Sequence, residues 1–185
     1  MARYEFAADF VSEGAKVLDL ACGVGYGSYI LATTTKCQRV LAIDISKEAI
    51  EYARQYYSSP KITYCQGDCL SIALEVATFD IVVSFETIEH IQQPGLLLSR
   101  FFTVLKPGGK LILSTPNELA MPFKRRKYPF HVRHYTPEEI TGLVRGAGFS
   151  IEKVFSQSSK LLFVPTSGWG GGYIILVCLK APSEA

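Results

Sequence analysis

The stretch Val17-Leu18-Asp19-Leu20-Ala21-Cys22-Gly23-Val24-Gly25-Tyr26-Gly27 decides the fold of this chain, because an apolar run that ends in an acid leads into three glycines at alternate positions. Glycine has no side chain to keep a ligand away and tolerates positive φ, so such a loop lets the backbone approach a bound molecule closely. We therefore predict a strand, a loop and a helix here, with a site for a nucleotide-like ligand near residue 20.

Two ligand classes compete for a unit of this kind. A dinucleotide fold has Gly-x-Gly-x-x-Gly, with the pyrophosphate seated on the helix N-terminus. Here the third glycine, Gly27, comes one place early, and Ser28 holds the place of the last. Asp19 would repel a diphosphate but can receive an ammonium group. These details favour a zwitterionic cofactor and disfavour a nicotinamide-dependent oxidoreductase.

In these residues the chain resembles motif I of the class I S-adenosylmethionine-dependent methyltransferases, and its later segments follow that family's order. Residues 39–43 predict a second strand closing on Asp44, about 20 residues past the glycines, where one carboxylate holds a ribose diol. Residues 61–65 predict a third strand before Gly67-Asp68-Cys69, which is similar to the family's adenine-binding turn. The resemblance implies that S-adenosylmethionine is bound by Asp19, Ala21, Gly23, Gly25, Gly27, Asp44, Ile45, Asp68, Cys69 and Phe85. Within this set, it implies that Asp44 binds the ribose, that Asp68 accepts from the adenine amino group and that Ile45 packs on the ring.

The alternation of strand-like and helix-like segments predicts an α/β fold. We expect a Rossmann-like, doubly wound, seven-stranded sheet, mostly parallel, with the antiparallel last strand of the family. Residues 79–85 are a near-continuous apolar run, typical of a central strand buried on both faces. Further strands are predicted at 105–114 (after a helix stop and a turn), 149–155 and 173–179, and helices near 25–34, 46–57, 94–104 and 137–146. The glycine-rich stretch 167–172 is predicted to be a flexible hairpin loop.

Composition indicates one globular domain. The chain has 185 residues, 48% of them hydrophobic and 19% charged, which suffices for a substantial core. We interpret 1–185 as a single domain with a cofactor-binding core (12–115), a substrate lid (116–137) and a C-terminal part of the sheet (138–180). No apolar stretch reaches the roughly 18 residues of a membrane span, and the first residues do not resemble a signal peptide. Five scattered cysteines without a C-x-x-C pair indicate small buried hydrophobes in a reducing compartment, so a cytoplasmic protein is expected.

The segment Glu86-Thr87-Ile88-Glu89-His90 follows the predicted fourth strand, at the sheet edge where open α/β proteins bind ligands. On a helical turn, Glu86 would project on the same side as Glu89 and His90. Two carboxylates and an imidazole that converge can bind a divalent cation. His131 follows the fifth strand at the same end of the sheet and can supply a fourth ligand.

This E-x-x-E-H pattern with a downstream histidine resembles two groups of metal-dependent O-methyltransferases, the ubiquinone-biosynthesis enzymes and the small-RNA 3′-terminal 2′-O-methyltransferases. The resemblance implies Mg²⁺ or Mn²⁺ bound by Glu86, Glu89, His90 and His131, where the ion holds acceptor hydroxyls and lowers the pKa of the alcohol. Glu-His-Ile after the fourth strand also occurs in superfamily members without a metal. On that alternative, His90, His131 or His134 is the general base.

The predicted lid is strongly basic. It contains Lys124-Arg125-Arg126-Lys127 followed by Tyr128-Pro129-Phe130, although the net charge of the chain is only +2. A basic, aromatic lid suits an anionic acceptor such as a phosphorylated metabolite, a nucleotide sugar or a nucleic-acid end. A solvated loop is the alternative, and basic character alone does not establish RNA binding. Few residues precede the first strand, so we expect an open site or one covered by another segment or a partner, with Tyr4 and Phe6 near its rim.

These observations predict transfer of a methyl group from S-adenosylmethionine to an oxygen of a small-molecule or sugar-containing acceptor, with no membrane partner. The sulfonium already activates the methyl, so the protein mainly aligns donor and acceptor. N-methylation is the nearest alternative, but the Asn-Pro-Pro-Tyr-like tetrad typical of exocyclic-amine enzymes is replaced by Ser84-Phe85-Glu86-Thr87. An RNA 2′-O-methyltransferase and a non-catalytic, cofactor-binding subunit of a larger complex also stay open.

Overall fold

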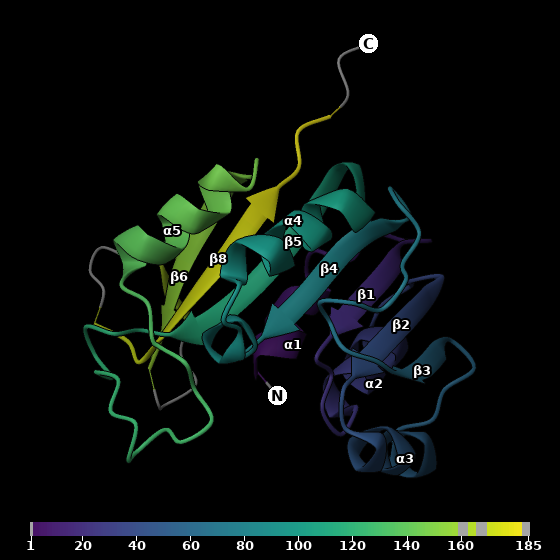
Figure 1. The fold of residues 1–185 in the computed structure, drawn as a ribbon. Helices are drawn as coiled ribbons and strands as arrows, with labels where there is room; N and C mark the ends of the chain where they lie inside the picture. Colours follow the sequence, from purple (N-terminus) through teal and green to yellow (C-terminus); the bar gives the residue numbers. More distant parts are fainter. Residues whose placement is uncertain (1, 159–162, 166–169, 183–185) are drawn as a thin grey trace.

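The computed structural model describes residues 2–158, 163–165 and 170–182. Within these ranges one mixed sheet runs through the molecule in the order β3-β2-β1-β4-β5-β8-β6-β7 (Figure 1). Its strands are β1 Lys16–Leu20, β2 Arg39–Asp44, β3 Ile62–Gln66, β4 Phe79–Phe85, β5 Leu105–Pro116, β6 Ser150–Gln157, β7 Phe163–Pro165 and β8 Tyr173–Leu179. The helices are α1 Ala2–Ala8, α2 Tyr26–Thr34, α3 Lys47–Tyr56, the 3₁₀ turn η1 Ile88–His90, α4 Pro94–Val104 and α5 Pro137–Gly146.

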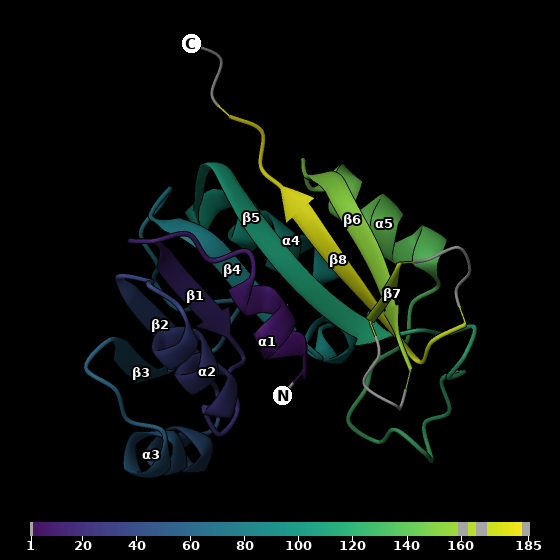
Figure 2. The same cartoon turned by 180° about the vertical axis from the view of Figure 1, so that it is seen from behind.

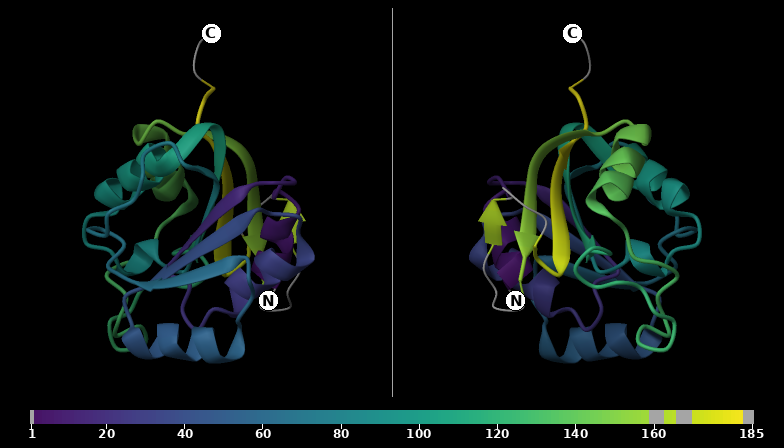
Figure 3. Two further views of the ribbon diagram at one scale, coloured as in Figure 1. Left: turned by 90° about the vertical axis from the view of Figure 1, so that its right-hand side faces the viewer. Right: turned by 90° about the vertical axis from the view of Figure 1, so that its left-hand side faces the viewer.

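The predicted α/β fold is confirmed. Strands β1 to β5 are parallel, and β8 inserts antiparallel between β5 and β6. The sheet is twisted, as Figure 3 shows. The three-residue β7 pairs with β6 at the outer edge as an additional short strand beyond the seven expected. Of the predicted glycine-rich hairpin loop, residues 167–169 lie outside the described residues.

Alternation along the strands divides the core between the two faces of the sheet. In β1, Leu18 and Leu20 pack on the face covered by α4 and α5, whereas Val17 packs on the face covered by α1 and α2 (Figure 2). In β8, alternate apolar residues likewise pack on these two opposite faces of the sheet. Each central strand is therefore apolar on both sides, which explains the continuous apolar runs in the sequence.

Two predicted helix starts are confirmed in atomic detail. The Ser46 side chain accepts a hydrogen bond from the backbone of Ala49 at the start of α3. Thr136 and Glu139 form a reciprocal capping box at the start of α5, with Pro137 at the first helical position. These caps fix where the chain turns from the carboxyl edge of the sheet into each helix.

The N-terminal segment differs from the expectation. It forms the helix α1, and its Phe6 ring packs edge-on against Phe10 and Phe155 rather than at the rim of a pocket. Burial of this apolar ring against the sheet outweighs exposure at the rim. Tyr4, on the same helix, does reach the cavity described below. No helix among the described residues is long and apolar enough to cross a membrane.

The parallel strands present their carboxyl ends at one edge, which faces downward in Figure 1. The segment 117–135 leaves β5 at this edge and returns to it, because Asn117 and Tyr135 form a β-bridge. The predicted lid is therefore a loop closed at its base, at the end of β5.

Candidate active site

A cavity of about 670 Å³ opens at the carboxyl ends of β1 and β4. Its wall includes the loop after β1, the end of β4, the helix α1 and the ends of β6 and β8. The described residues that line it are Ala2, Arg3, Tyr4, Ala21, Cys22, Gly23, Val24, Tyr26, Phe85, Glu86, Gln157, Ser158 and Tyr173. This is the position at which open α/β sheets bind their ligands.

The glycine-rich loop takes the left-handed conformations that its glycines permit. Gly23 has φ +55° and Gly25 has φ +84°. A Cβ on Gly25 would lie 2.5 Å from the Cβ of Ala53, whereas a Cβ on Gly23 would meet nothing within 4 Å. Gly25 is thus required by packing between the loop and α3, and Gly23 leaves its space to the cavity.

Two non-glycine residues beside the cavity also have positive φ. They are Ala21 at +66°, directly after β1, and Glu86 at +53°, directly after β4. Such conformations cost energy for residues with a Cβ and gather at functional sites. Both residues line the cavity, so the backbone strain lies where a ligand would be held.

Asp19, Gly25 and Gly27 lie behind the cavity wall. Asp19 is completely buried and accepts hydrogen bonds from the Tyr4 hydroxyl at 3.0 Å and the Ser28 hydroxyl at 2.5 Å. Burial raises the pKa of Asp19 to about 7. A Cβ on Gly27 would lie 2.1 Å from Cζ of Tyr4, so the tyrosine ring covers this glycine. These residues stabilise the loop from inside the protein. Because Asp19 is completely buried in this structure, a ligand ammonium group has no open path to it, contrary to the predicted direct contact.

The predicted ribose ligand Asp44 lies at the end of β2, next to the loop. One of its carboxylate oxygens accepts from the backbone N–H of Gly23 at 2.8 Å and the other from that of Ser46 at 2.9 Å. A carboxylate has about four acceptor positions, so two further hydrogen bonds can be made. Ile45 follows with its side chain 68% exposed, an apolar surface available for stacking.

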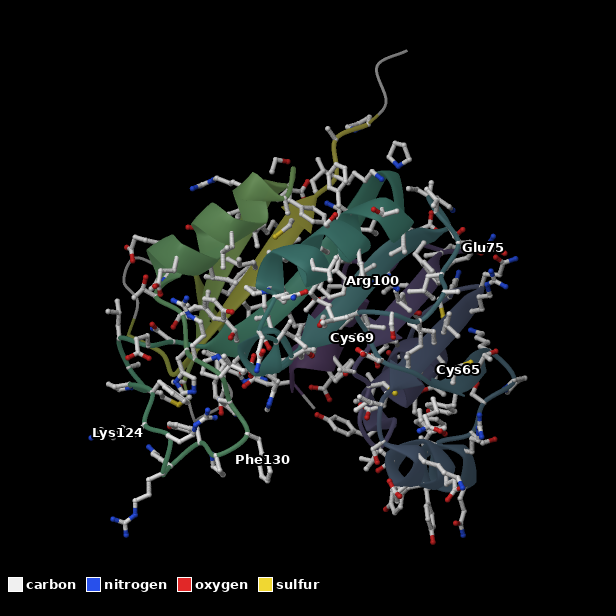
Figure 4. All side chains as sticks on the ribbon, in the orientation of Figure 1. Cys65, Cys69, Glu75, Arg100, Lys124 and Phe130 are labelled. Atoms are coloured by element: carbon white, nitrogen blue, oxygen red, sulfur yellow. The ribbon has the colours of Figure 1, made fainter. Side chains whose placement is uncertain are left out.

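The predicted adenine turn is held against α4. Asp68 is exposed and accepts from the backbone N–H of Leu70 at 2.9 Å. The Arg100 guanidinium donates to the carbonyl of Cys69 at 2.9 Å and also to the carbonyl of Ile72. Figure 4 shows Arg100 of α4 beside Cys69. One arginine thus fixes a turn that has no helix or strand of its own.

Sequence reasoning missed Arg3, which lines the cavity from α1. Its Nη1 lies 3.1 Å from Oε1 of Glu86, and its Nε donates to Gln157 at 2.6 Å. The guanidinium also lies 4.1 Å from the ring centre of Tyr173. No local pattern could identify it, because its partners are up to 170 residues away along the chain.

Glu86 faces this cavity. Its Oε1 accepts from the Ser114 hydroxyl at 2.9 Å in addition to its ion pair with Arg3. Burial raises the pKa of Glu86, and Arg3 and Ser114 oppose that rise. Because the residue precedes the 3₁₀ turn and has a left-handed backbone, it does not continue the turn that carries Glu89 and His90. Glu86 thus lies outside the 3₁₀ turn but close enough to raise the pKa of Glu89, and its part in a metal site stays a prediction.

Three predicted metal ligands do come together. One ligand atom from each of Glu89, His90 and His131 lies within 4.8 Å of the other two, and Glu86 is outside this group. Glu89 is completely buried; its Oε2 accepts from the Thr115 hydroxyl at 3.1 Å, while its Oε1 has no hydrogen-bond partner among the described residues. Burial, and next the nearby Glu86, raise the pKa of Glu89 to about 8.

The histidines have distinct partners. His90 Nδ1 lies 2.9 Å from the carbonyl oxygen of Phe130 and therefore donates to it, which leaves Nε2 with a free lone pair. His131 Nδ1 lies 2.8 Å from Nε2 of His134, and His134 Nδ1 lies 2.5 Å from the carbonyl oxygen of Met121. Both nitrogens of His134 are thus engaged in hydrogen bonds, and the residue is buried.

The lid carries its charge outward. The Arg125 guanidinium donates to the carbonyl of His131 at 3.0 Å, and Lys127 lies 5.1 Å from the ring centre of Tyr128. Phe130 is 81% exposed. Lys124 and Phe130 extend from the lid in Figure 4 away from the sheet. The base of the lid is tied to the group formed by Glu89, His90 and His131, because the Val132 N–H donates to the carbonyl of Glu89 at 2.7 Å.

Comparison with known proteins identifies relatives of this arrangement. The family model described as a methyltransferase domain matches residues 11–145. A probable S-adenosylmethionine-dependent methyltransferase of Mycolicibacterium smegmatis is 34% identical over 141 residues, which cover 75% of this chain and 53% of that protein. The ubiquinone biosynthesis O-methyltransferase of Xanthomonas axonopodis pv. citri is 33% identical over 168 residues, which cover 82% of this chain and 68% of that protein. Phosphoethanolamine N-methyltransferase 1 of Triticum aestivum is 36% identical over 143 residues, with 69% and 28% covered.

Solved structures share the fold. An S-adenosylmethionine-dependent methyltransferase from Mesorhizobium loti superposes with a TM-score of 0.80 at 18% identity, covering 97% of this chain and 98% of that one. A Haloferax volcanii methyltransferase, solved in complex with an activator protein, gives a TM-score of 0.84 at 21% identity, with 97% and 89% covered. The chain spans about half the length of the mycobacterial relatives it matches.

Proposed function

The chain belongs to the class I S-adenosylmethionine-dependent methyltransferases, and from that premise we propose that it methylates an oxygen of a hydroxyl-bearing acceptor with the help of a divalent cation. The observation that carries the proposal is the convergence of Glu89, His90 and His131, with a buried carboxylate oxygen that lacks a partner among the described residues. Glu89 and His90 follow directly after the end of β4, where Phe85 and Glu86 line the cavity. We further propose that 1–185 act as one domain, with residues 12–115 holding the cofactor, 116–137 forming the acceptor lid and 138–180 completing the sheet.

Some of the predicted cofactor residues would contact the cofactor, and others would support the loop that holds it. Ala21, Gly23 and Phe85 line the cavity and would contact the methionine part directly. Asp44 would accept from the ribose hydroxyls and Ile45 would stack on the adenine, with Asp68 and Cys69 at its edge. Arg3 is added to this set, because its guanidinium can donate to the cofactor carboxylate. Asp19, Gly25 and Gly27 would support the loop.

The donor set fits a divalent cation. Burial without a hydrogen bond is costly for the Oε1 atom of Glu89, and a cation would satisfy it. His90 keeps an Nε2 lone pair free because its Nδ1–H is donated to a backbone carbonyl, the usual arrangement of a metal-bound histidine. Imidazole nitrogens suit first-row transition-metal ions, whereas Mg²⁺ prefers oxygen ligands, so of the two expected ions this donor set favours Mn²⁺. When bound, the ion would supply a Lewis acid that lowers the pKa of an acceptor hydroxyl.

The residues of the chain would perform the remaining steps. The loop and Phe85 orient the cofactor, and the ends of β4 and β5 place the acceptor oxygen for in-line attack on the methyl carbon. Without a cation, the free Nε2 of His90 is the candidate to take the hydroxyl proton.

The lid indicates the class of acceptor. The guanidinium and ammonium groups of residues 124–127 are solvent-exposed and lie a few residues before His131 in the sequence. An acceptor with a phosphate or carboxylate would be attracted by them while its hydroxyl lies at Glu89 and His90. N-methylation of a phosphorylated amine is a second candidate, which the 36% identity to the wheat phosphoethanolamine enzyme favours.

Calorimetric titration tests the proposal. S-adenosylhomocysteine is titrated into metal-stripped protein, and Mg²⁺ or Mn²⁺ is then titrated into wild type, Glu89→Ala, His90→Ala and the control Glu75→Ala on the surface. We expect cofactor binding in all four and metal binding in wild type and the control only. Absence of cofactor binding to wild type would contradict the methyltransferase assignment, and equal metal binding in all four proteins would contradict the metal site.

A further inference from the structure

His134 is a buried histidine that the proposed chemistry does not use. Only 3% of it is exposed, and it is surrounded by lid residues. Its ring centre lies 4.5 Å from that of Tyr128 and 5.5 Å from that of Phe123. A buried polar ring needs partners for both nitrogens; its hydrogen bonds are with Met121 and His131, and a carboxylate oxygen of Glu118 lies 4.0 Å from its Nδ1.

When His134 is neutral, the hydrogen-bond chain fixes the protons of both imidazoles. A carbonyl oxygen can only accept, so the bond to Met121 places the His134 proton on Nδ1. A neutral imidazole carries one N–H, which makes Nε2 of His134 an acceptor. His131 must then donate from Nδ1, and its own Nε2 keeps a lone pair. These positions follow from the network of donors and acceptors.

In the alternative tautomer, His131 could not bind a cation through Nε2. If His131 carried its proton on Nε2, that nitrogen would have no lone pair for a cation, and Nδ1 would face a second lone pair on His134. The orientation of the His131 ring is also restricted, because it stacks on Tyr128 with ring centres 5.2 Å apart and contacts His90 edge-on at 4.6 Å. The protonation of His131 is therefore set by His134, and its ring orientation is restricted in part by Tyr128, neither of which is a proposed cation ligand.

We propose that His134 is a positioning residue: it accepts the Nδ1–H of His131 and thereby keeps the Nε2 of His131 ready to bind a divalent cation. On the other side of the His134 ring, the carbonyl of Met121 accepts the Nδ1–H and so keeps His134 in the tautomer whose Nε2 is an acceptor. This inference rests on the proposed metal site, and it assigns His134 a role other than base or ligand.

A pair of substitutions separates the two hydrogen bonds of His134. In His134→Gln the amide oxygen can lie near the former Nε2 and accept from His131. In His134→Asn the shorter amide can still donate to Met121 but cannot reach His131. We expect Mn²⁺ affinity, measured by paramagnetic resonance of the free ion, to fall about 10- to 100-fold in His134→Asn and to stay within about threefold of wild type in His134→Gln.

A second measurement reads the tautomer directly. Nitrogen-15 spectra of the imidazoles in metal-free wild-type protein should show His131 protonated on Nδ1 only, and His134→Asn should lose this preference. Unchanged Mn²⁺ affinity in both variants, or an equal loss in both, would overturn the inference. If wild type binds no Mn²⁺, the proposed metal chemistry fails, and the wild-type tautomer of His131 still decides this inference: protonation on Nε2 would refute it.

Discussion

The hydroxyl of Tyr4 donates a 3.0 Å hydrogen bond to Oδ1 of Asp19, and so the N-terminal helix is bonded to the acid that opens the glycine-rich loop. Both groups are buried. We expect Tyr4→Phe to lower the free energy of unfolding by about 1 to 3 kcal/mol, because a buried carboxyl loses a donor. Urea unfolding measures this. The control Tyr56→Phe, on a side chain 58% exposed, should change stability little, and an equal effect of both would contradict the expectation.

Asp19 should make the stability depend on pH. Burial raises its pKa from 3.8 to about 7, so between these values the folded protein holds a proton that the unfolded chain has released. This stabilisation is full below the unfolded pKa and is lost as pH rises through about 7; from about pH 5 to about pH 7 it amounts to about 2 kcal/mol. Unfolding of wild type and Asp19→Asn across this range is the test. The wild-type curve should fall more steeply with pH, and parallel curves would refute the assignment.

Ile45 offers a test of cofactor binding that leaves the fold intact. Its side chain is 68% exposed, so Ile45→Ala should not affect stability. If adenine stacks on it, the loss of apolar contact costs about 1 to 2 kcal/mol, or about 5- to 30-fold in S-adenosylhomocysteine affinity. Val76, also 68% exposed but on the loop before β4, provides the matched control Val76→Ala. Equal S-adenosylhomocysteine affinities in the two variants would show that Ile45 does not contact the cofactor.

Substitution of Arg100 should weaken S-adenosylhomocysteine binding indirectly, through the turn that Arg100 holds at Cys69. Its two bonds to the carbonyls of Cys69 and Ile72 need the planar fork of a guanidinium. In Arg100→Lys the turn loses at least one of them, and we expect about 1 kcal/mol less stability with a weaker affinity for S-adenosylhomocysteine. Hydrogen exchange of residues 68–72 reports the loosening. An unchanged exchange pattern together with weaker binding would point to a direct contact of Arg100 with the cofactor instead.

Most of the sheet could be predicted because its signals are local. An apolar run buried on both faces, a serine or threonine cap and a glycine turn each lie within about ten residues, and β1, β4, α3 and α5 begin or end close to where these patterns place them. β5 begins at Leu105 and includes the predicted turn, with a register shift against β4 between Phe79 and Ile81. Local pattern cannot reveal such an irregularity, since it depends on the partner strand.

The site was only partly predictable for a similar reason. Glu89, His90 and His131 were identified from sequence spacing and converge in the structure. Glu86 departs from them because of one backbone torsion, φ +53°, which sequence spacing does not encode. Arg3 was missed because its contacts with Gln157 and Tyr173 exist only after β6 and β8 have joined the sheet.

The ring of Tyr4 occupies the space that a side chain at position 27 would need. The third glycine of the motif therefore reflects what lies on the N-terminal helix, and the two positions should vary together in related sequences. Homologues with alanine or serine at the position of Gly27 should carry a smaller residue at the position of Tyr4, while those that keep the tyrosine should keep the glycine. The pairing of these two positions would thus distinguish, among related methyltransferases, those whose N-terminal segment folds onto the loop in the same way.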